Sequence, residues 1–396
     1  MNLGKLCIKN IKEKLGFTLL SISTLALSLC LLFIIQHLKS NFQNQIDHNL
    51  GKIDMVVGAK GSPLQLVLSS VLHIDNPTGN IPLNSLNKLQ RNPLVKSTIP
   101  IAFGDNYKGY KIVATESDFL NLYNAQIRLG KLFNKSKQVI IGAEIAKKLS
   151  LTIGDQIQSS HGLIEDSNHV HEDALEIVGI LAPTQKIIDR LIISDLQTIW
   201  DIHEHEHQAH TVNEDKEITS ILVTFKNKMG LLSLPRKINS QTKLQAAIPK
   251  YELDKLYNYT SVGLDTVSWI AYCILIIANL LIFISLYKMV KERSYDLAIL
   301  RTYGAKKHQL ISLVFLEGGI IFLSALIVAT LFTKLGLQLI TAQIDLGNHQ
   351  SINENIQYLN FLPHVGLVGC SVIVGIILAV YPILNMDISK ILKHEK

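Results

Sequence analysis

Histidine is concentrated in two short polar stretches of this sequence. The first, DIHEHEHQAH, contains His203, His205, His207 and His210 with glutamates between them. The second, SSHGLIEDSNHVHED, contains His161, His169 and His171. Neutral imidazole and carboxylate groups bind Zn²⁺, and imidazole also titrates near pH 6.5. Both stretches are therefore candidate sites for metal or proton binding.

The spacing of these histidines does not select one geometry. In a helix His203 and His207 share a face, whereas in an extended segment His203, His205 and His207 do. Three interpretations stay open. They are a solvated loop that binds metal only adventitiously, a site that captures or senses zinc, and a pH sensor.

A charged segment, KERSYDLAILRTYGAKKHQL, lies between two apolar runs. Glu292, Arg293, Asp296 and Arg301 supply charge along its first part, before the turn. Tyr295 and Ile299 share a helix face, and Gly304, followed by Ala305, is placed to end the helix. We predict a short amphipathic helix and a turn, which suits docking into a groove of a soluble partner. An interfacial linker attracted to anionic lipid is the alternative.

Glu317 is the acidic residue of the apolar run that follows this segment. A carboxylate at the centre of a bilayer costs about 2.5–3.5 kcal/mol on insertion scales. We therefore expect Glu317 to bond within a helix bundle. A structural role is favoured over the alternative, a proton relay.

Several signatures of chemistry are absent from the sequence. The phosphate-loop pattern G-x-x-x-x-G-K-[ST] does not occur, and neither G-x-S-x-G nor C-x-x-C is present. The stretch HEHEH is not expected to be a zinc-peptidase helix, because its second histidine follows the first by two residues, whereas H-E-x-x-H needs four. The chain is thus not expected to be an enzyme or to bind a cofactor of its own, zinc aside, and any Mg-ATP is expected on a partner chain.

The composition points to a membrane protein. The chain has 396 residues, of which 48% are hydrophobic and 18% charged. A helix needs about 20 apolar residues to cross a bilayer. Runs of this kind predict spans at 16–36, 265–287, 309–334 and 363–384. The first run is too long for a signal-peptide core and no cleavage site follows it, so we expect it to remain as a span.

A large polar domain, residues 37–264, separates the first two predicted spans. Short β-branched runs such as those in ALEIVGILA and ITSILVTFKN predict strands. DLQTIWDIHE and LLSLPRKINSQTKLQAAI predict helices, and Ser62 with Pro63 predicts another helix start. That last helix is expected either in the core or at a surface that meets a partner. We predict an α+β domain without disulfides, because none of the 4 cysteines lies in it.

Basic residues predict the orientation of the spans. Lysine and arginine cluster in 1–15, 288–308 and 385–396, whereas the loop 335–362 has none. These three segments are expected in the cytoplasm, with 1–15 as an amphipathic helix on the inner leaflet. The domain 37–264 is then extracytoplasmic, both termini are cytoplasmic, and the protein lies in the inner membrane. The net charge of +6 follows from this topology and implies no nucleic acid.

The segment KERSYDLAILRTYGAKKHQLISLVFLEG resembles the permease signature of the MacB/FtsX superfamily of ABC transporters, which includes the LolC/LolE lipoprotein-releasing subunits. The matching positions are Glu292, Arg293, Asp296, Arg301, Gly304, Ala305 and Glu317. The tail AVYPILNMDISKILK matches the family ending at Pro382 and Asp387. It departs at Ile388, where the family usually has proline.

The resemblance implies a permease subunit that works on its exported side by mechanotransmission. Two permeases, identical or paralogous, would pair in the bilayer, and each would dock an ABC ATPase through the cytoplasmic helix. The implied cargo is a lipoprotein, a peptide, a lipid or a metal-linked (zinc) carrier, with a periplasmic or lipoprotein partner. The alternatives are an FtsX-like regulator that activates a periplasmic cell-wall hydrolase, and a metal or pH sensor without transport.

Overall fold

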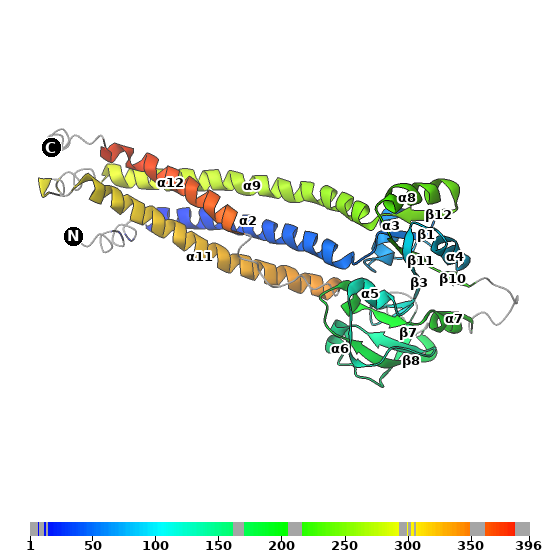
Figure 1. Cartoon of the computed structure of the whole chain (residues 1–396). Helices are drawn as coiled ribbons and strands as arrows, with labels where there is room; N and C mark the ends of the chain where they lie inside the picture. The colour runs from blue at the N-terminus through cyan, green and yellow to red at the C-terminus, as the bar shows by residue number, and fades with distance from the viewer. Residues whose placement is uncertain are drawn as a thin grey trace. The chain divides into compact units, whose positions relative to one another are not determined.

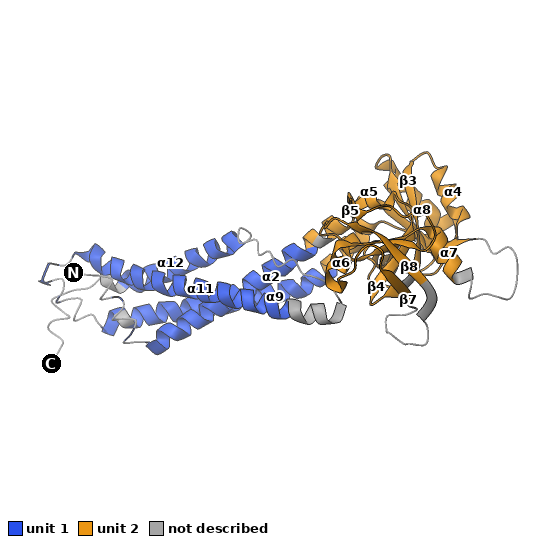
Figure 2. Ribbon diagram, turned by 90° about the horizontal axis from the view of Figure 1, so that it is seen from below, with its two compact units in different colours: residues 1–42, 259–396 blue, residues 43–258 orange. Residues whose placement is uncertain are grey.

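In the computed structural model the chain forms two compact units (Figure 2). Unit 1 contains residues 1–42 and 259–396, and unit 2 contains residues 43–258. The residues that the structure describes are 7, 12, 15–160, 170–204, 216–292, 299, 302–304, 306–348 and 361–384.

Four long helices build unit 1 (Figure 1). They are α2 (Leu15–Asn49), α9 (Pro249–Glu292), α11 (Lys307–Asn348) and α12 (Leu362–Leu384). All four are long and apolar enough to cross a membrane. The prediction of a four-span α-helical membrane protein is thus confirmed. The helices exceed the apolar runs: α2 and α9 extend into unit 2, and α11 continues into the segment 335–362, which was predicted to be a loop.

Small and polar side chains hold the four helices together. Ala278, Ala325 and Ala379 are fully buried at the centre of the bundle. Small residues allow close backbone approach, which drives helix association where lipid is as apolar as the side chains. The Ser28 hydroxyl donates to the Ala271 carbonyl at 3.0 Å, and the Asn279 amide donates to the Ser371 hydroxyl at 3.1 Å. Both bonds join different helices.

Unit 2 is built around a 10-stranded mixed sheet. The strand order is β12-β1-β11-β3-β4-β9-β6-β8-β5, with β7 paired to β3 and β8, while β10 and β2 form a separate pair. The strands are β1 (Met55–Ala59), β2 (Ile81–Pro82), β3 (Val95–Tyr107), β4 (Tyr110–Thr115), β5 (Ile127–Gly130), β6 (Gln138–Ile141), β7 (Gln156–Ser160), β8 (Val170–Leu181), β9 (Ile192–Ser194), β10 (Glu217–Ile218), β11 (Ser220–Phe225) and β12 (Leu244–Ala247). The pairs β4–β9 and β6–β8 are parallel.

Short helices connect and cover these strands. They are α3 (Pro63–Ser70), α4 (Asn84–Gln90), α5 (Phe119–Tyr123), α6 (Ala143–Leu149), η1 (Ile187–Arg190), α7 (Leu196–Glu204) and α8 (Met229–Gln241). The core is rich in β-branched residues, including Val57, Ile112 and Ile193, which suit a pleated surface packed on one side. The alternation of helices and strands confirms the predicted mixed α and β domain.

The helix start predicted at Ser62 and Pro63 is confirmed. The Ser62 side chain accepts a hydrogen bond from the Gln65 backbone N–H at 3.4 Å, and Pro63 is the first residue of α3. Proline suits this position because its fixed φ fits a helix and its missing N–H would be unsatisfied there. Leu66 and Val67 are buried, so α3 packs against the core of unit 2.

The prediction of one helix through LLSLPRKINSQTKLQAAI is wrong in its second half. Helix α8 ends at Gln241, and Leu244–Ala247 forms β12, which pairs with β1. The Asn239 side chain completes the free edge of β12, because its amide donates to the Ala246 carbonyl at 3.0 Å and accepts from the Ala246 N–H at 2.6 Å. Pairing with a distant strand overrides a local pattern that is compatible with helix.

Candidate functional site

The predicted coupling segment begins where α9 ends. Glu292 is the last residue of α9, and Gly304 has a φ of +96°, the left-handed conformation that ends a helix. The Tyr303 N–H donates to the Ile299 carbonyl at 3.0 Å, as expected of a helical turn at this point. The predicted coupling residues Arg293, Tyr295, Asp296, Arg301 and Ala305 lie outside the described residues.

Glu317 lies in the packed interior of unit 1. Its side chain is buried, with a relative exposure of 4%, on helix α11. The next residue, Gly318, faces α12, because a Cβ built there would lie 2.5 Å from the Ile376 Cδ1 atom. Glu317 therefore lies inside the bundle, and the choice between a structural role and a proton relay stays a prediction.

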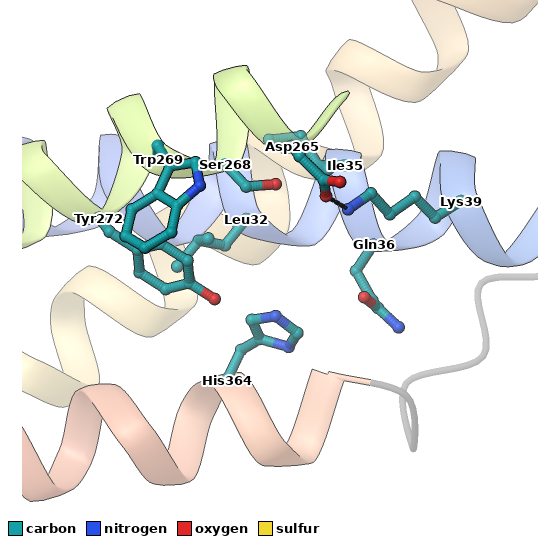
Figure 3. Close-up of a pocket in the computed structure, with 9 residues that line it drawn as sticks. All are labelled: Leu32, Ile35, Gln36, Lys39, Asp265, Ser268, Trp269, Tyr272 and His364. Carbon is teal, nitrogen blue, oxygen red and sulfur yellow. Dashed lines mark hydrogen bonds and ion pairs between the residues drawn. The ribbon is translucent and has the colours of Figure 1, made fainter. Parts of the chain in front are cut away.

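A cavity opens between α2, α9 and α12 in unit 1 (Figure 3). Its volume is about 360 Å³. The lining residues are Leu32, Ile35, Gln36 and Lys39 of α2, Asp265, Ser268, Trp269 and Tyr272 of α9, and His364 of α12. Lys39 and Asp265 form an ion pair at its rim. The cavity therefore combines charged, polar and apolar walls.

The polar side chains of the cavity are arranged toward a common space. In Figure 3 the Tyr272 hydroxyl points toward the His364 ring, and the Gln36 amide extends from α2 on the same side. The Nδ1 atom of His364 is buried and has no hydrogen-bond partner in the described part of the chain. The Trp269 and Tyr272 rings lie edge to face with centroids 6.2 Å apart. This arrangement can bind a ligand with several hydrogen-bonding groups.

Sequence reasoning missed this cavity. Each of its polar residues taken alone is an ordinary residue near the end of an apolar run. The signal that could have found it is the recurrence of polar residues at the same ends of three runs, at Lys39, Asp265 and His364. Such residues are rare inside membrane helices and often mark functional sites.

The predicted metal site is not tested by the described residues. His205, His207, His210 and His169 lie outside them. His203 belongs to α7 and His171 to the backbone of β8. Among the residues whose placement is given, no three His, Cys, Asp or Glu side chains could hold a metal ion. The exclusion of HEHEH as a zinc-peptidase pattern is wrong on spacing, because His203, Glu204 and His207 satisfy H-E-x-x-H.

A buried histidine in unit 2 was also missed. His73 is 5% exposed, and neither ring nitrogen has a hydrogen-bond partner among the described residues. Its ring lies edge to face with the rings of Phe103 and Phe119, at centroid distances of 5.5 and 6.2 Å. Burial, together with the charge of Lys111, lowers the pKa of His73 from its ordinary value to about 3. His73 is therefore neutral in the folded domain at pH 5 to 7.

We expect unit 2 to lose stability as the pH falls below 6.5. The unfolded chain protonates His73 near pH 6.5 while the folded domain does not, so the free energy of unfolding falls by about 2 kcal/mol between pH 7 and pH 5. Urea unfolding followed by Trp200 fluorescence, in a Trp269→Phe background, measures this difference.

The matched variant for this measurement is His73→Phe, which keeps an aromatic ring in the cluster. Its stability should change less between pH 7 and pH 5, by about the same 2 kcal/mol. An identical pH dependence in both proteins would contradict the role of His73.

Two family models match the sequence. The model described as the MacB-like periplasmic core domain matches residues 18–231, which is more than half of the chain. The model described as the FtsX-like permease C-terminal region matches residues 268–388. A search of curated proteins finds no significant match.

Solved structures give weaker likenesses. The periplasmic region of MacB from Actinobacillus actinomycetemcomitans is 11% identical, with a TM-score of 0.36, covering 55% of this chain and 98% of that one. The extracellular domain of the noncanonic ABC-type transporter YknZ from Gram-positive bacteria is 12% identical, with a TM-score of 0.32, covering 48% and 98%. A domain of a putative permease protein from Porphyromonas gingivalis is 13% identical, with a TM-score of 0.29, covering 51% and 90%. At these TM-scores the likenesses carry no argument.

Proposed function

Because this chain belongs to the MacB/FtsX-type family of ABC transporter permeases, we propose that it transmits the motion of a separate ATPase to its own exported domain. In this proposal the chain performs no chemistry itself. Mg-ATP is bound and hydrolysed by the partner subunit, and the permease converts closure of the ATPases into movement of unit 2.

The observation that carries this proposal is the continuity of α9. The helix begins at Pro249, directly after strand β12 of unit 2, and is unbroken to Glu292, where the coupling segment begins. An unbroken α-helix keeps its backbone hydrogen bonds along its whole length, so it resists bending better than a loop. Helix α2 likewise contributes residues to both units.

The coupling segment supplies the site at which the ATPase would act. We propose that the face with Tyr295 and Ile299 inserts into a groove of the ATPase, and that Glu292, Arg293, Asp296 and Arg301 bond to its rim. The turn at Gly304, with its positive φ, supports a compact element between α9 and α11. A membrane helix holds each end of this element, so a movement of the bound ATPase would be transmitted to α9 and α11.

We further propose the inner membrane as the location, with both termini and the coupling segment in the cytoplasm. The distribution of lysine and arginine supports this orientation. A second copy or a paralogue would complete the assembly, with an exported or lipoprotein partner and a cargo of the lipoprotein, peptide, lipid or metal-linked class. Cysteine labelling that reaches position 306 from outside the cell would contradict the orientation.

Breaking the continuity of α9 tests the proposal. A flexible Gly/Ser insertion after Asn258 should leave co-purification with the ATPase intact. It should abolish the ATP-dependent change in distance between spin labels at position 150 in paired copies. The control is a seven-residue helical insertion at the same point, which keeps the helix continuous and should preserve the change. An ATP-dependent change that survives the flexible insertion would overturn the proposal.

A further inference from the structure

We propose that the cavity between α2, α9 and α12 binds the headgroup of a zwitterionic phospholipid, of the phosphoethanolamine class. The inference rests on the residues that line the cavity and does not depend on coupling to an ATPase. The whole site lies within unit 1, on three helices that are long and apolar enough to cross a membrane (Figure 3).

The charges at the cavity are paired and of opposite sign. Lys39 and Asp265 form an ion pair, and both side chains stay accessible, with exposures of 24% and 55%. A phosphate group can approach the Lys39 ammonium while an ammonium group approaches the Asp265 carboxylate. A ligand that carries a phosphate and an ammonium group joined by a two-carbon link matches this pair, whereas a purely anionic headgroup would meet the repulsion of Asp265.

Uncharged hydrogen-bonding groups complete the polar wall. The Gln36 amide and the Tyr272 hydroxyl make no hydrogen bond within the described part of the chain. The buried Nδ1 atom of His364 also has no partner there. A buried polar atom without a partner costs free energy, and a ligand or water that reaches it recovers that cost. Phosphate and ester oxygens accept hydrogen bonds from such groups, and an ammonium group donates to them.

The apolar wall suits the part of a lipid next to the headgroup. Leu32 and Ile35 are buried beside the cavity, while the Trp269 ring is 70% exposed at its edge. Tryptophan and tyrosine are enriched where membrane helices meet the headgroup region, because their rings are apolar with one polar atom. Trp269 and Tyr272 lie one to two helical turns after Asp265 on α9. The cavity is thus amphipathic in the order that a phospholipid requires, with charges at one end and apolar side chains at the other.

Native mass spectrometry of the full-length chain in detergent tests the proposal. The probes are phosphatidylethanolamine and phosphatidylglycerol with identical acyl chains, and soluble phosphoethanolamine. We expect the chain to retain phosphatidylethanolamine about fivefold better than phosphatidylglycerol, the effect of one ion-pair interaction. Competition by soluble phosphoethanolamine would show that the headgroup suffices, while its failure to compete would show that the lipid body contributes. Both results support a headgroup site if the lipid preference is present.

The variants separate binding from folding. Asp265→Asn should remove the preference between the two lipids. The double variant Gln36→Leu/Tyr272→Phe should weaken retention of phosphatidylethanolamine while leaving the Lys39–Asp265 pair intact, so a loss there cannot come from a broken ion pair. Ile277→Ala, an exposed position on α9 outside the cavity, is the control and should retain the lipid like the parent chain. Equal retention of both lipids by the parent chain, or an unchanged preference in Asp265→Asn, would overturn the proposal.

Discussion

The double variant Tyr295→Asp/Ile299→Asp should lose at least about 30-fold of its affinity for the ATPase, because removal of a central apolar anchor costs about 2 kcal/mol or more. Ile299 is partly buried and accepts hydrogen bonds from the Tyr303 N–H and the Thr302 hydroxyl. A buried carboxylate in the groove of a partner adds a desolvation cost to the lost contact. Co-purification and the stimulation of ATP hydrolysis by the permease measure the loss.

Conservative replacement separates docking from folding in this experiment. Ile299→Leu keeps the apolar character of the face and should bind the ATPase nearly as the parent does. Membrane insertion of both variants should be unchanged, because the substitutions lie outside the apolar runs. If the double aspartate variant stimulates its ATPase fully, the segment is not the docking site.

Gly318→Leu should destabilise the helix bundle by about 2–3 kcal/mol, the usual effect of overpacking. A Cβ at Gly318 would lie 2.5 and 2.7 Å from the Cδ1 and Cγ1 atoms of Ile376 and 3.6 Å from the Leu286 Cδ1 atom. Distances under 3 Å require Ile376 on α12 to move, and the larger leucine side chain forces the helices apart. Unfolding in mixed micelles of increasing SDS fraction measures the change.

Gly319→Leu is the matched control for this substitution. Apart from the neighbouring backbone of α11, no atom of the described residues lies within 4 Å of a Cβ built at Gly319, so a leucine there has room. Replacing glycine by leucine in a helix interior also stabilises the helix by up to about 1 kcal/mol, because leucine has the higher helix propensity. If Gly318→Leu and Gly319→Leu destabilise the bundle equally, the close contact between Gly318 and α12 is not the cause.

The sequence by itself determined the membrane helices and their order. A bilayer leaves no water to satisfy backbone groups, so an apolar run of sufficient length has only the helix available. This condition is local, and it can be read from composition along the chain. The prediction was therefore right about four spans and the mixed domain. The signature from Glu292 to Glu317 was enough to identify the family, which the two matching family models confirm.

Only the tertiary structure decided which residues meet. Lys39 and Asp265 are 226 positions apart, and no local pattern pairs them. The burial of His73 against Phe103 and the pairing of β12 with β1 likewise depend on long-range packing. Such contacts are selected by the fit of distant surfaces, whose free energies are small and depend on the whole fold, so they cannot be read from periodicity. The cavity beside His364 belongs to the same class, since it exists only where three helices pack imperfectly.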